Sequence, residues 1–341
     1  MRYSLLLLIF VIPALGIASV LWVRSSVTAR ADHSAGSRII TVEPGMSTQA
    51  IVDRLSDAGI VRHPIALRIY LRVSGRGGEL KAGDYIFPSP ISPLEAIERI
   101  ERGEVHIERI TIPEGYSRFE IARTLAVDTG RATADEFLRL MDDPSPVARF
   151  APEARNLEGY LFPDTYNYTM VTTPEELIRG MVSRFEEAVT PERVARAKEL
   201  GLSLHQVITI ASIIEKEARV AEERPLISSV FANRLRLGMP LASDPTFIYA
   251  AKLENDYDGN PNNPRHRRRL SLYNTYIFSG LPPGPIASPG SESIDAALHP
   301  ADTNYLYFVV SGTGGRHKFS ATAAEHEVAV QQYRRQQRAL R

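Results

Sequence analysis

The chain of 341 residues has 40 Lys plus Arg, 40 Asp plus Glu and 44% hydrophobic residues, which are ordinary values for a globular protein with a sizeable core. A formal net charge of zero gives no reason to expect nucleic acid as a partner, and the absence of cysteine excludes disulfides, thiolate metal sites and cysteine nucleophiles. The length allows two or three domains.

Residues 1–25 are expected to form a transmembrane anchor. The stretch from Tyr3 to Val23 contains no charged residue and spans roughly 30 Å as a helix, about the thickness of a hydrocarbon core. A cleaved signal peptide is the alternative, but the apolar run is longer than such a segment needs. Basic residues flank both ends almost equally, so orientation is weakly specified; either interpretation exports the rest of the chain if the N-terminus stays in the cytoplasm.

Two further regions are predicted before the larger domain. Residues 26–37 are small and polar, which is typical of a linker. Residues 38–106 predict a strand, two helices, a second strand and a third helix that Ser92 caps. This strand–helix–helix–strand order resembles a small LysM-like α+β subdomain, and a generic α+β subdomain is the alternative.

The larger domain is predicted to cover residues 107–335. It opens with a strand, a Pro-x-Gly turn and a helix, as the preceding subdomain does, which indicates an internal repeat or a common way to cap a helix. An apolar helix from Val207 to Ala221 is expected at its centre, with strands such as Tyr305 to Val310. Arg265 to Arg269 fall in a loop that is solvated or binds an anionic polymer or lipid. The predicted fold class is α+β.

The central helix carries two carboxylates within the stretch "ASIIEKEARVAEER". Successive helical residues turn by about 100°, so Glu215 and Glu217 point roughly 200° apart and cannot act as a local pair. Each glutamate lies on a largely apolar face of the helix, so the periodicity does not indicate which of the two is functional. Burial would raise the pKa of either carboxyl, as a general acid at neutral pH requires. The alternative is that both lie solvated or ion-paired at the helix end.

Other stretches hold candidate substrate contacts. "LEGYLFPDTYNY" combines acids with aromatic rings, which is typical of sugar binding and also of a core strand entering a turn. The "ASDPTFIYA" and "LYNTYIFSGLPPGPIASPG" stretches could shape a cleft wall or a plain surface connection. The sequence contains no G-x-S-x-G elbow, Walker loop or HExxH spacing, so neither a metal nor a cofactor is expected. The candidate contacts are Glu158, Tyr160, Asp164, Asp244, Thr246 and Asn274.

Taken in order, these stretches and "ITIPEGYS", "VFANRLRLGMPLASDPTFIYA", "ALHPADTNYLYFV" and "HKFSATAAEHE" closely resemble the endolytic murein transglycosylase family. The resemblance covers most of residues 108–330. It implies cleavage between N-acetylmuramic acid and N-acetylglucosamine within nascent glycan strands, with a 1,6-anhydro end that terminates elongation. It also implies that Glu215, the first glutamate of the "ASI-x-EKE" motif, is catalytic. Glu217 is then expected to be structural.

The implied mechanism needs one carboxylate. Glu215 would protonate the glycosidic oxygen and then accept the proton of the muramic C6 hydroxyl, whose oxygen closes on C1; this differs from the usual two-carboxylate glycosidase. The substrate's acetamido group or Asn274 would stabilise the cation. One alternative is a hydrolase that pairs Glu215 with Glu158 or Asp244, and another is a non-catalytic wall-binding protein. The resemblance further implies a single-pass inner-membrane protein whose catalytic domain lies outside the cytoplasm and associates with peptidoglycan synthases.

Overall fold

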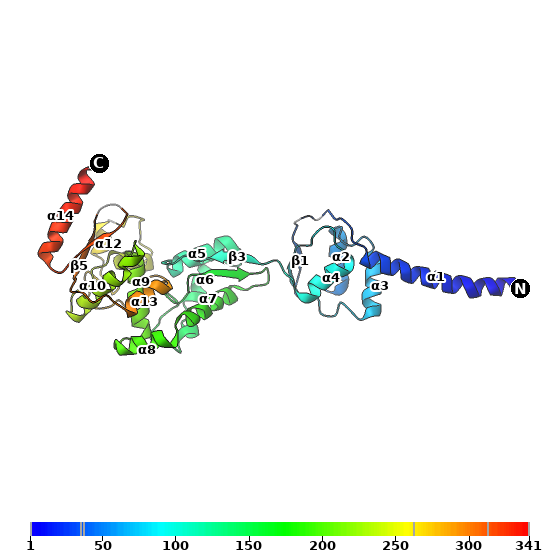
Figure 1. Ribbon diagram of the computed structural model, residues 1–341, viewed down its shortest axis with the longest axis horizontal. Coiled ribbons are helices and arrows are strands. Elements are labelled where there is room, and N and C mark those ends of the chain that lie inside the picture. The colour runs from blue at the N-terminus through cyan, green and yellow to red at the C-terminus, as the bar shows by residue number, and fades with distance from the viewer. Residues whose placement is uncertain (1, 35, 37, 262, 312–313, 340–341) are drawn as a thin grey trace. The chain divides into compact units, whose positions relative to one another are not determined.

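The computed structural model describes residues 2–34, 36, 38–261, 263–311 and 314–339 (Figure 1). It is a mixed helix-and-sheet structure whose sheets are all small and two-stranded in the part of the chain described. The chain forms two compact units, each of which is taken by itself below. The first unit comprises Met1–Arg109 and Asn167–Thr172, and the second comprises Ile110–Tyr166 and Thr173–Arg341.

The first unit begins with helix α1 (Arg2–Thr28). Its part from Val11 to Thr28 has a mean hydropathy of 1.5, is 6% buried, and is long and apolar enough to cross a membrane by length and composition. The helix continues to Thr28 because Val27 is fully buried in the core of the unit. Beyond it, Ala31 exchanges two backbone hydrogen bonds with Ile91. The predicted linker therefore begins as a helix and then packs against the unit.

The rest of the first unit follows the strand–helix–helix–strand order that the sequence predicts. The two strands pair antiparallel, with Ile40 opposite Tyr85 and Val42 opposite Gly83. Ser92 caps the last helix in a reciprocal capping box with Glu95, as expected. The elements are β1 (Ile40–Val42), α2 (Thr48–Asp57), α3 (Pro64–Ser74), β2 (Gly83–Tyr85) and α4 (Pro93–Arg102).

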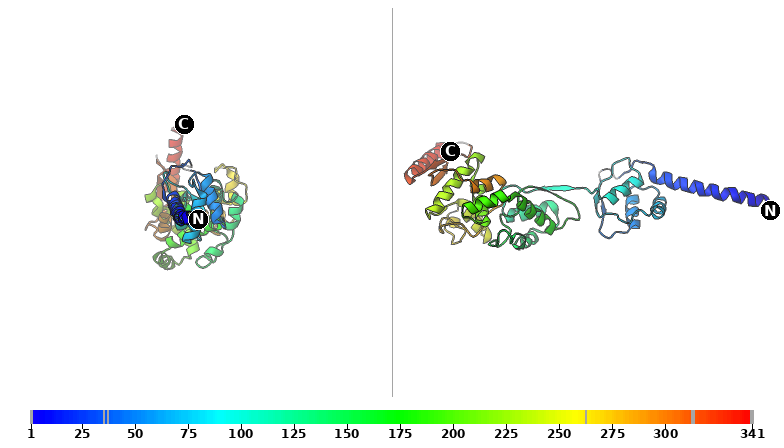
Figure 2. Two further views of the ribbon diagram at one scale, coloured as in Figure 1. Left: turned by 90° about the vertical axis from the view of Figure 1, so that its right-hand side faces the viewer. Right: turned by 60° about the horizontal axis from the view of Figure 1, so that its bottom comes forward.

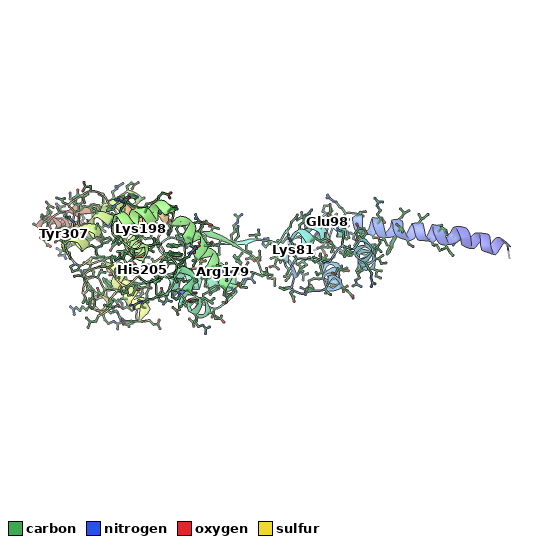
Figure 3. All side chains as sticks on the ribbon, turned by 90° about the horizontal axis from the view of Figure 1, so that it is seen from below. Lys81, Glu98, Arg179, Lys198, His205 and Tyr307 are labelled. Carbon is green, nitrogen blue, oxygen red and sulfur yellow. The ribbon has the colours of Figure 1, made fainter. Side chains whose placement is uncertain are left out.

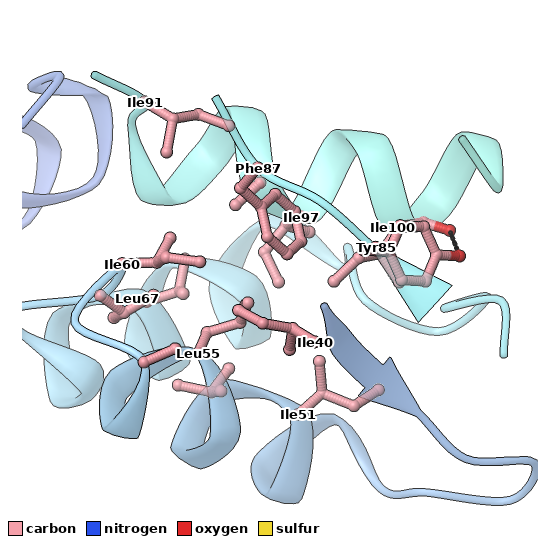
Figure 4. Close-up of a cluster of buried hydrophobic side chains, with 14 of the residues drawn as sticks. Ile40, Ile51, Leu55, Ile60, Leu67, Tyr85, Phe87, Ile91, Ile97 and Ile100 are labelled. Carbon is pink, nitrogen blue, oxygen red and sulfur yellow. Dashed lines mark hydrogen bonds between the residues drawn. The ribbon is translucent and has the colours of Figure 1, made fainter. Parts of the chain in front are cut away.

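One hydrophobic core holds these elements together (Figure 4). Each helix gives it one apolar face, represented by Leu55, Leu67 and Ile97, which are all fully buried. Tyr85 at the end of the second strand and Phe87 just after it add stacked aromatic rings. The right-hand view of Figure 2 shows the blue and cyan helices of this unit close together.

The second unit is mostly helical. Strands β3 and β4 form one sheet, and each strand passes from one unit into the other. The elements are β3 (Glu108–Thr111), α5 (Arg118–Thr129), α6 (Ala134–Met141), η1 (Ser145–Val147), β4 (Thr165–Tyr168), α7 (Pro174–Ala188), α8 (Pro191–Glu199), α9 (Leu204–Glu217), η2 (Ala221–Glu223), α10 (Arg224–Arg236), α11 (Asp244–Leu253), α12 (Pro264–Arg267), α13 (Ser291–Leu298), β5 (Tyr307–Val310), β6 (His317–Ser320) and α14 (Ala323–Ala339).

Helix α9 is central to the second unit, as its apolar sequence predicts. It packs against α8, α10, α11 and α13, and its residues from Val207 to Ile214 are all buried. Ser203 begins the helix in a capping box with Gln206. The helix ends at Glu217 because Ala218 has extended backbone angles, which is four residues earlier than expected. Both glutamates therefore lie in its last turn.

A hairpin of β5 and β6 lies against the other side of α10, and α14 packs on both strands. The strands pair antiparallel, with Tyr307 opposite Ser320 and Val310 opposite His317. The predicted strand from Tyr305 to Val310 is confirmed for its last four residues. The hairpin brings the C-terminal segment next to elements that lie about 70 to 100 residues earlier in the chain.

Candidate functional site

A cleft of about 380 Å³ lies in the second unit beside the end of α9. Seven elements and two loops contribute to it, so it exists only in the folded chain. We call it the Glu217 cleft. Its lining residues are Glu217, Arg234, Leu241, Ala242, Asp244, Arg267, Tyr276, Tyr307, Phe308, Val309, Val310, His317 and His326.

Glu217 is the carboxyl group best suited to acid chemistry in this cleft. Burial raises its pKa to about 7, and the negative charge of Asp244 acts in the same direction. The Ser243 hydroxyl donates a hydrogen bond of 2.6 Å to Glu217 Oε1 and works against that rise. A carboxyl group with this pKa holds a proton part of the time at neutral pH, so it can donate one and take one back.

Asp244 brings a second carboxylate to the cleft. It is the first residue of α11, and the Tyr276 hydroxyl donates a hydrogen bond of 2.6 Å to its Oδ1 atom. The Arg267 guanidinium stacks over the Tyr276 ring at 4.0 Å from the ring centre. The cleft thus combines carboxyl groups, a cation and exposed aromatic faces, which together suit a polar polymer with apolar sugar faces.

Glu215 lies in a different environment. Its side chain is 9% exposed, the Gly290 amide donates to its Oε2 atom at 3.1 Å, and Arg224 Nη2 lies 3.9 Å from Oε1. Glu114 approaches the same arginine, and a Cβ atom on Gly290 would lie 1.9 Å from a Glu114 oxygen, so a larger residue there would displace the Glu114 carboxylate. Glu215 therefore helps to join α9 to the loop before α13, and it does not line the Glu217 cleft.

A larger cavity of about 610 Å³ in the same unit contains neither glutamate. Residues of α6, η1 and α7 line it, including Arg179. Figure 3 labels Arg179 well apart from Tyr307 of the Glu217 cleft. We take the Glu217 cleft as the candidate site because of the chemistry of its lining residues, although it is the smaller of the two.

Glu158 is buried away from the cleft. It is 2% exposed, and its two carboxylate oxygens each accept a hydrogen bond of 3.1 Å from the Arg118 amide at the start of α5. Burial raises its pKa to about 7. Its position supports the packing of α5 on the Leu157–Phe162 loop, and Glu158 is not among the residues that line the Glu217 cleft.

Tyr160 belongs to a buried polar chain. Its hydroxyl lies 2.6 Å from His205 Nδ1, and His205 Nε2 lies 2.9 Å from the Pro283 carbonyl (His205 is labelled in Figure 3). A carbonyl can only accept, so Nε2 carries the proton, Nδ1 accepts and the Tyr160 hydroxyl donates. This chain ties the aromatic loop to α9 and to the proline-rich loop. Burial raises the pKa of Tyr160.

Asp164 also lies outside the cleft. Arg184 Nε donates to its Oδ2 atom at 2.7 Å, and this bond lowers the pKa of the carboxyl. Its side chain is 40% exposed beside α7. The structure thus gives it an ion-pair partner rather than a place among the groups of the Glu217 cleft.

Thr246 and Asn274 are buried behind the cleft wall and stabilise it through hydrogen bonds to backbone carbonyls. Thr246 is fully buried and donates to the Ser243 carbonyl at 2.6 Å. Asn274 is also fully buried, and its amide donates to the carbonyls of Arg267 and Arg269 at 2.9 Å each. The Asn274 amide is thus bound to backbone carbonyls. Of the six predicted contacts, Asp244 alone is among the residues that line the cleft.

Several cleft residues had no functional assignment from the sequence. Ser243 and Tyr276 stand in quoted motifs but carry no distinctive spacing, and Arg267 belongs to a basic run typical of solvated loops. Tyr307 and His317 come from the C-terminal hairpin, far along the chain. Among the described residues, no group of three or more His, Asp or Glu side chains could hold a metal ion.

Comparison with known proteins identifies relatives along almost the whole chain. The model of the YceG-like family matches residues 40–332. The endolytic murein transglycosylase of Bacillus subtilis is 32% identical over 318 residues, which cover 86% of this chain and 84% of that protein. The protein of that name from Streptococcus pneumoniae D39 is 30% identical over 320 residues, and the match covers 86% of this chain but 58% of that protein.

A solved structure agrees with these matches. The crystal structure of a yceG-like protein from Listeria monocytogenes is 31% identical and superimposes with a TM-score of 0.59. The match covers 85% of this chain and 97% of that one. The family model spans well over half of the chain, so the protein belongs to the YceG-like family.

Proposed function

We propose that this protein is an endolytic murein transglycosylase, a lyase that cuts the bond between N-acetylmuramic acid and N-acetylglucosamine within peptidoglycan glycan strands and leaves a 1,6-anhydro end. Two relatives that share about 30% of its residues over 86% of the chain carry that name. The observation that carries the proposal in the structure is a carboxyl group of raised pKa in a cleft with aromatic and charged walls.

We further propose that Glu217 performs the chemistry. Protonated Glu217 donates its proton to the glycosidic oxygen, the C1–O bond breaks, and positive charge develops at the muramic C1. Ionised Glu217 then accepts the proton of the C6 hydroxyl as oxygen 6 bonds to C1. The N-acetylglucosamine end leaves as an alcohol, the ring closes as an anhydro sugar, and no water is consumed.

The choice of Glu217 over Glu215 departs from the assignment that the family resemblance implies. Two observations support this choice: Glu217 lines the cleft, and its pKa is raised to about 7. Glu215 accepts from the Gly290 amide and lies beside Arg224, and these contacts support a structural role. Asp244, the other carboxylate among the lining residues described, is available to stabilise the cation.

A hydrolase that uses Glu217 and Asp244 is the second candidate, because both carboxylates lie in one cleft. The mass of the products separates the two reactions. An anhydro end is lighter by one water than the reducing end that hydrolysis leaves. Exclusive formation of reducing ends by the purified protein would therefore exclude the transglycosylase proposal.

The assignment of the catalytic glutamate is tested by two matched substitutions, Glu217→Gln and Glu215→Gln, in the full-length chain. We expect Glu217→Gln to reduce anhydro-product formation by at least about a hundredfold, since it removes the only proton donor of the reaction. Glu215→Gln should retain most of the activity that its thermal stability allows. The reverse outcome would return the catalytic role to Glu215.

We also propose that α1 anchors the protein in the inner membrane, with both units outside the cytoplasm near peptidoglycan synthases. The apolar helix and the wall-polymer substrate support this location. The first unit is proposed to be a LysM-like glycan-binding module, which its strand–helix–helix–strand order supports. Binding of purified glycan strands by residues 23–109 expressed alone, which keep Val27 in the core, together with fractionation of the full chain, tests these assignments.

A further inference from the structure

A buried histidine–carboxylate pair lies in the wall of the Glu217 cleft. The side chains of Glu223 and His317 are 7% and 4% exposed. The His317 backbone amide donates to both Glu223 oxygens at 3.1 Å, and His317 Nδ1 lies 2.8 Å from Glu223 Oε2. Three contacts from one residue hold the start of β6 against η2 and leave the ring little freedom to rotate.

The pair fixes which ring nitrogen carries a proton. A carboxylate accepts and does not donate, so Nδ1–H donates to Glu223. Phe308 meets the ring edge-on with centres 5.3 Å apart, and Phe319 lies 6.3 Å away, so apolar groups flank the other faces. In the neutral ring, Nε2 then carries a lone pair.

That second nitrogen is free to act on a ligand. Nε2 of His317 has no hydrogen-bond partner among the described residues. It is also absent from the fully buried side-chain atoms that lack a partner, which means that Nε2 is not fully buried. His317 lines the cleft together with Glu217. An acceptor held rigidly at a cleft wall costs little further ordering when a ligand donates to it.

We infer that Glu223 is a positioning residue that holds His317 with Nε2 as a hydrogen-bond acceptor for a hydroxyl or acetamido N–H group of the glycan strand in the Glu217 cleft. This inference rests on the proposed function for the identity of the ligand, and it adds an uncharged acceptor to the carboxylates of the cleft. His317 orients the sugar, while Glu217 moves the protons.

The first experiment compares His317→Asn with the full-length wild-type chain. An asparagine amide can replace Nδ1–H as donor to Glu223 but places nothing at Nε2, so the fold is kept and the acceptor is lost. We expect the KM for glycan strands to rise about tenfold, the factor of one hydrogen bond of ordinary strength, with kcat less affected. His299→Asn, at an exposed position that does not line the cleft, is the control.

The second experiment measures directly which nitrogen of the His317 ring carries the proton. Nitrogen-15 spectra of histidine-labelled protein should show His317 as the Nδ1–H form, with Nε2 shifting when glycan strands are added. Glu223→Gln offers one acceptor oxygen instead of two, so we expect a mixture of ring forms and a similar loss of affinity. A purely structural pair would lower the melting temperature in His317→Asn and leave the KM unchanged.

The outcomes separate this inference from the proposed function. If the wild type binds glycan but forms no anhydro ends, the reaction is misassigned, and the Nε2 shift and the affinity of His317→Asn still decide the role of His317. If anhydro ends form normally and His317→Asn keeps the wild-type KM, or if Nε2 carries the proton in the free protein, the inference is overturned and the proposed function stands.

Discussion

At the scale of single residues, two glutamates with raised pKa values lie in different surroundings. Glu158 and Glu217 both have pKa values raised to about 7, with burial as the leading cause. Glu158 is bound to a backbone amide inside the second unit, whereas Glu217 faces a cleft. A perturbed pKa therefore indicates function only together with access to a ligand.

The pH dependence of catalysis follows from Glu217. The first step needs its protonated form, and a pKa of about 7 means that this form disappears as the pH rises above neutrality. We expect kcat/KM for anhydro-product formation to fall about tenfold per pH unit above pH 8. A rate that stays level from pH 7 to pH 9 would contradict a general acid of this pKa.

Glu158 should affect stability instead. Its folded-state pKa lies above the ordinary value of 4.5, so the stability it contributes is fully present below pH 4.5 and is lost as the pH rises through about 7. Glu158→Gln is expected to flatten the fall of the unfolding free energy between pH 5 and pH 7, by up to about 1.4 kcal/mol per pH unit. Urea titrations across this range measure the slope, and unchanged glycan cleavage in the variant serves as the functional control.

Gly159 shows a steric limit in the same loop. Its φ is +84°, and an added Cβ would lie 2.4 Å from Pro285 Cβ and 3.1 Å from the Ile208 side chain. Gly159→Ala should therefore lower the melting temperature strongly, with a loss of roughly 2 to 4 kcal/mol or no folded protein at all. Gly180→Ala, at an open helical position, should be neutral or stabilising in the same assay.

At the scale of elements, α9 connects the stability of the second unit to its site. Ser203 caps its start, its middle is buried, and its last turn presents the two glutamates on different sides. The turn after Glu217 then leads into η2 and places Glu223 beside β6. One short segment thus supplies the proposed acid, a structural carboxylate and the positioning residue.

The N-cap of α9 gives a prediction at this scale. Ser203 Oγ accepts from the Gln206 amide, and the Gln206 side chain accepts from the Ser203 amide. Ser203→Ala should cost about 1 kcal/mol of unfolding free energy, and Ser203→Asp should restore most of it. Both variants should cleave glycan normally at temperatures where they are folded, because the cap lies fourteen residues from Glu217. Loss of activity in a fully folded Ser203→Ala protein would show that the cap also positions the site.

At the scale of the whole molecule, α1 joins the proposed membrane anchor to the first unit. The end of this helix is part of the core, since Val27 is fully buried there. The segment from Val11 to Val23, by contrast, is almost entirely exposed. Removal of residues 2–22 should therefore release the protein from the membrane fraction and preserve the melting of the first unit. Removal of residues 2–28 should also destabilise that unit by about 1 to 3 kcal/mol, which differential scanning calorimetry of the two truncations can resolve.

Local patterns in the sequence were sufficient for much of the fold. The apolar first helix, the capped helix after Ser92, the strand–helix–helix–strand order and the central position of α9 all follow from periodicity and caps, which act between residues close in the chain. The end of α9 could not be predicted in this way. The residues from Ala218 to Val220 can be helical, and the packing of the next segment ends the helix before them.

The site depended on tertiary structure. Helix geometry separates Glu215 from Glu217 by sequence alone, but both faces are apolar, so the sequence leaves open which carboxyl meets a cleft. The fold decides this by bringing α11, α12 and the C-terminal hairpin to the Glu217 side, and Gly290 and Arg224 to the Glu215 side. Burial and charge then set the pKa, and both depend on neighbours up to about a hundred residues away, which no local pattern specifies.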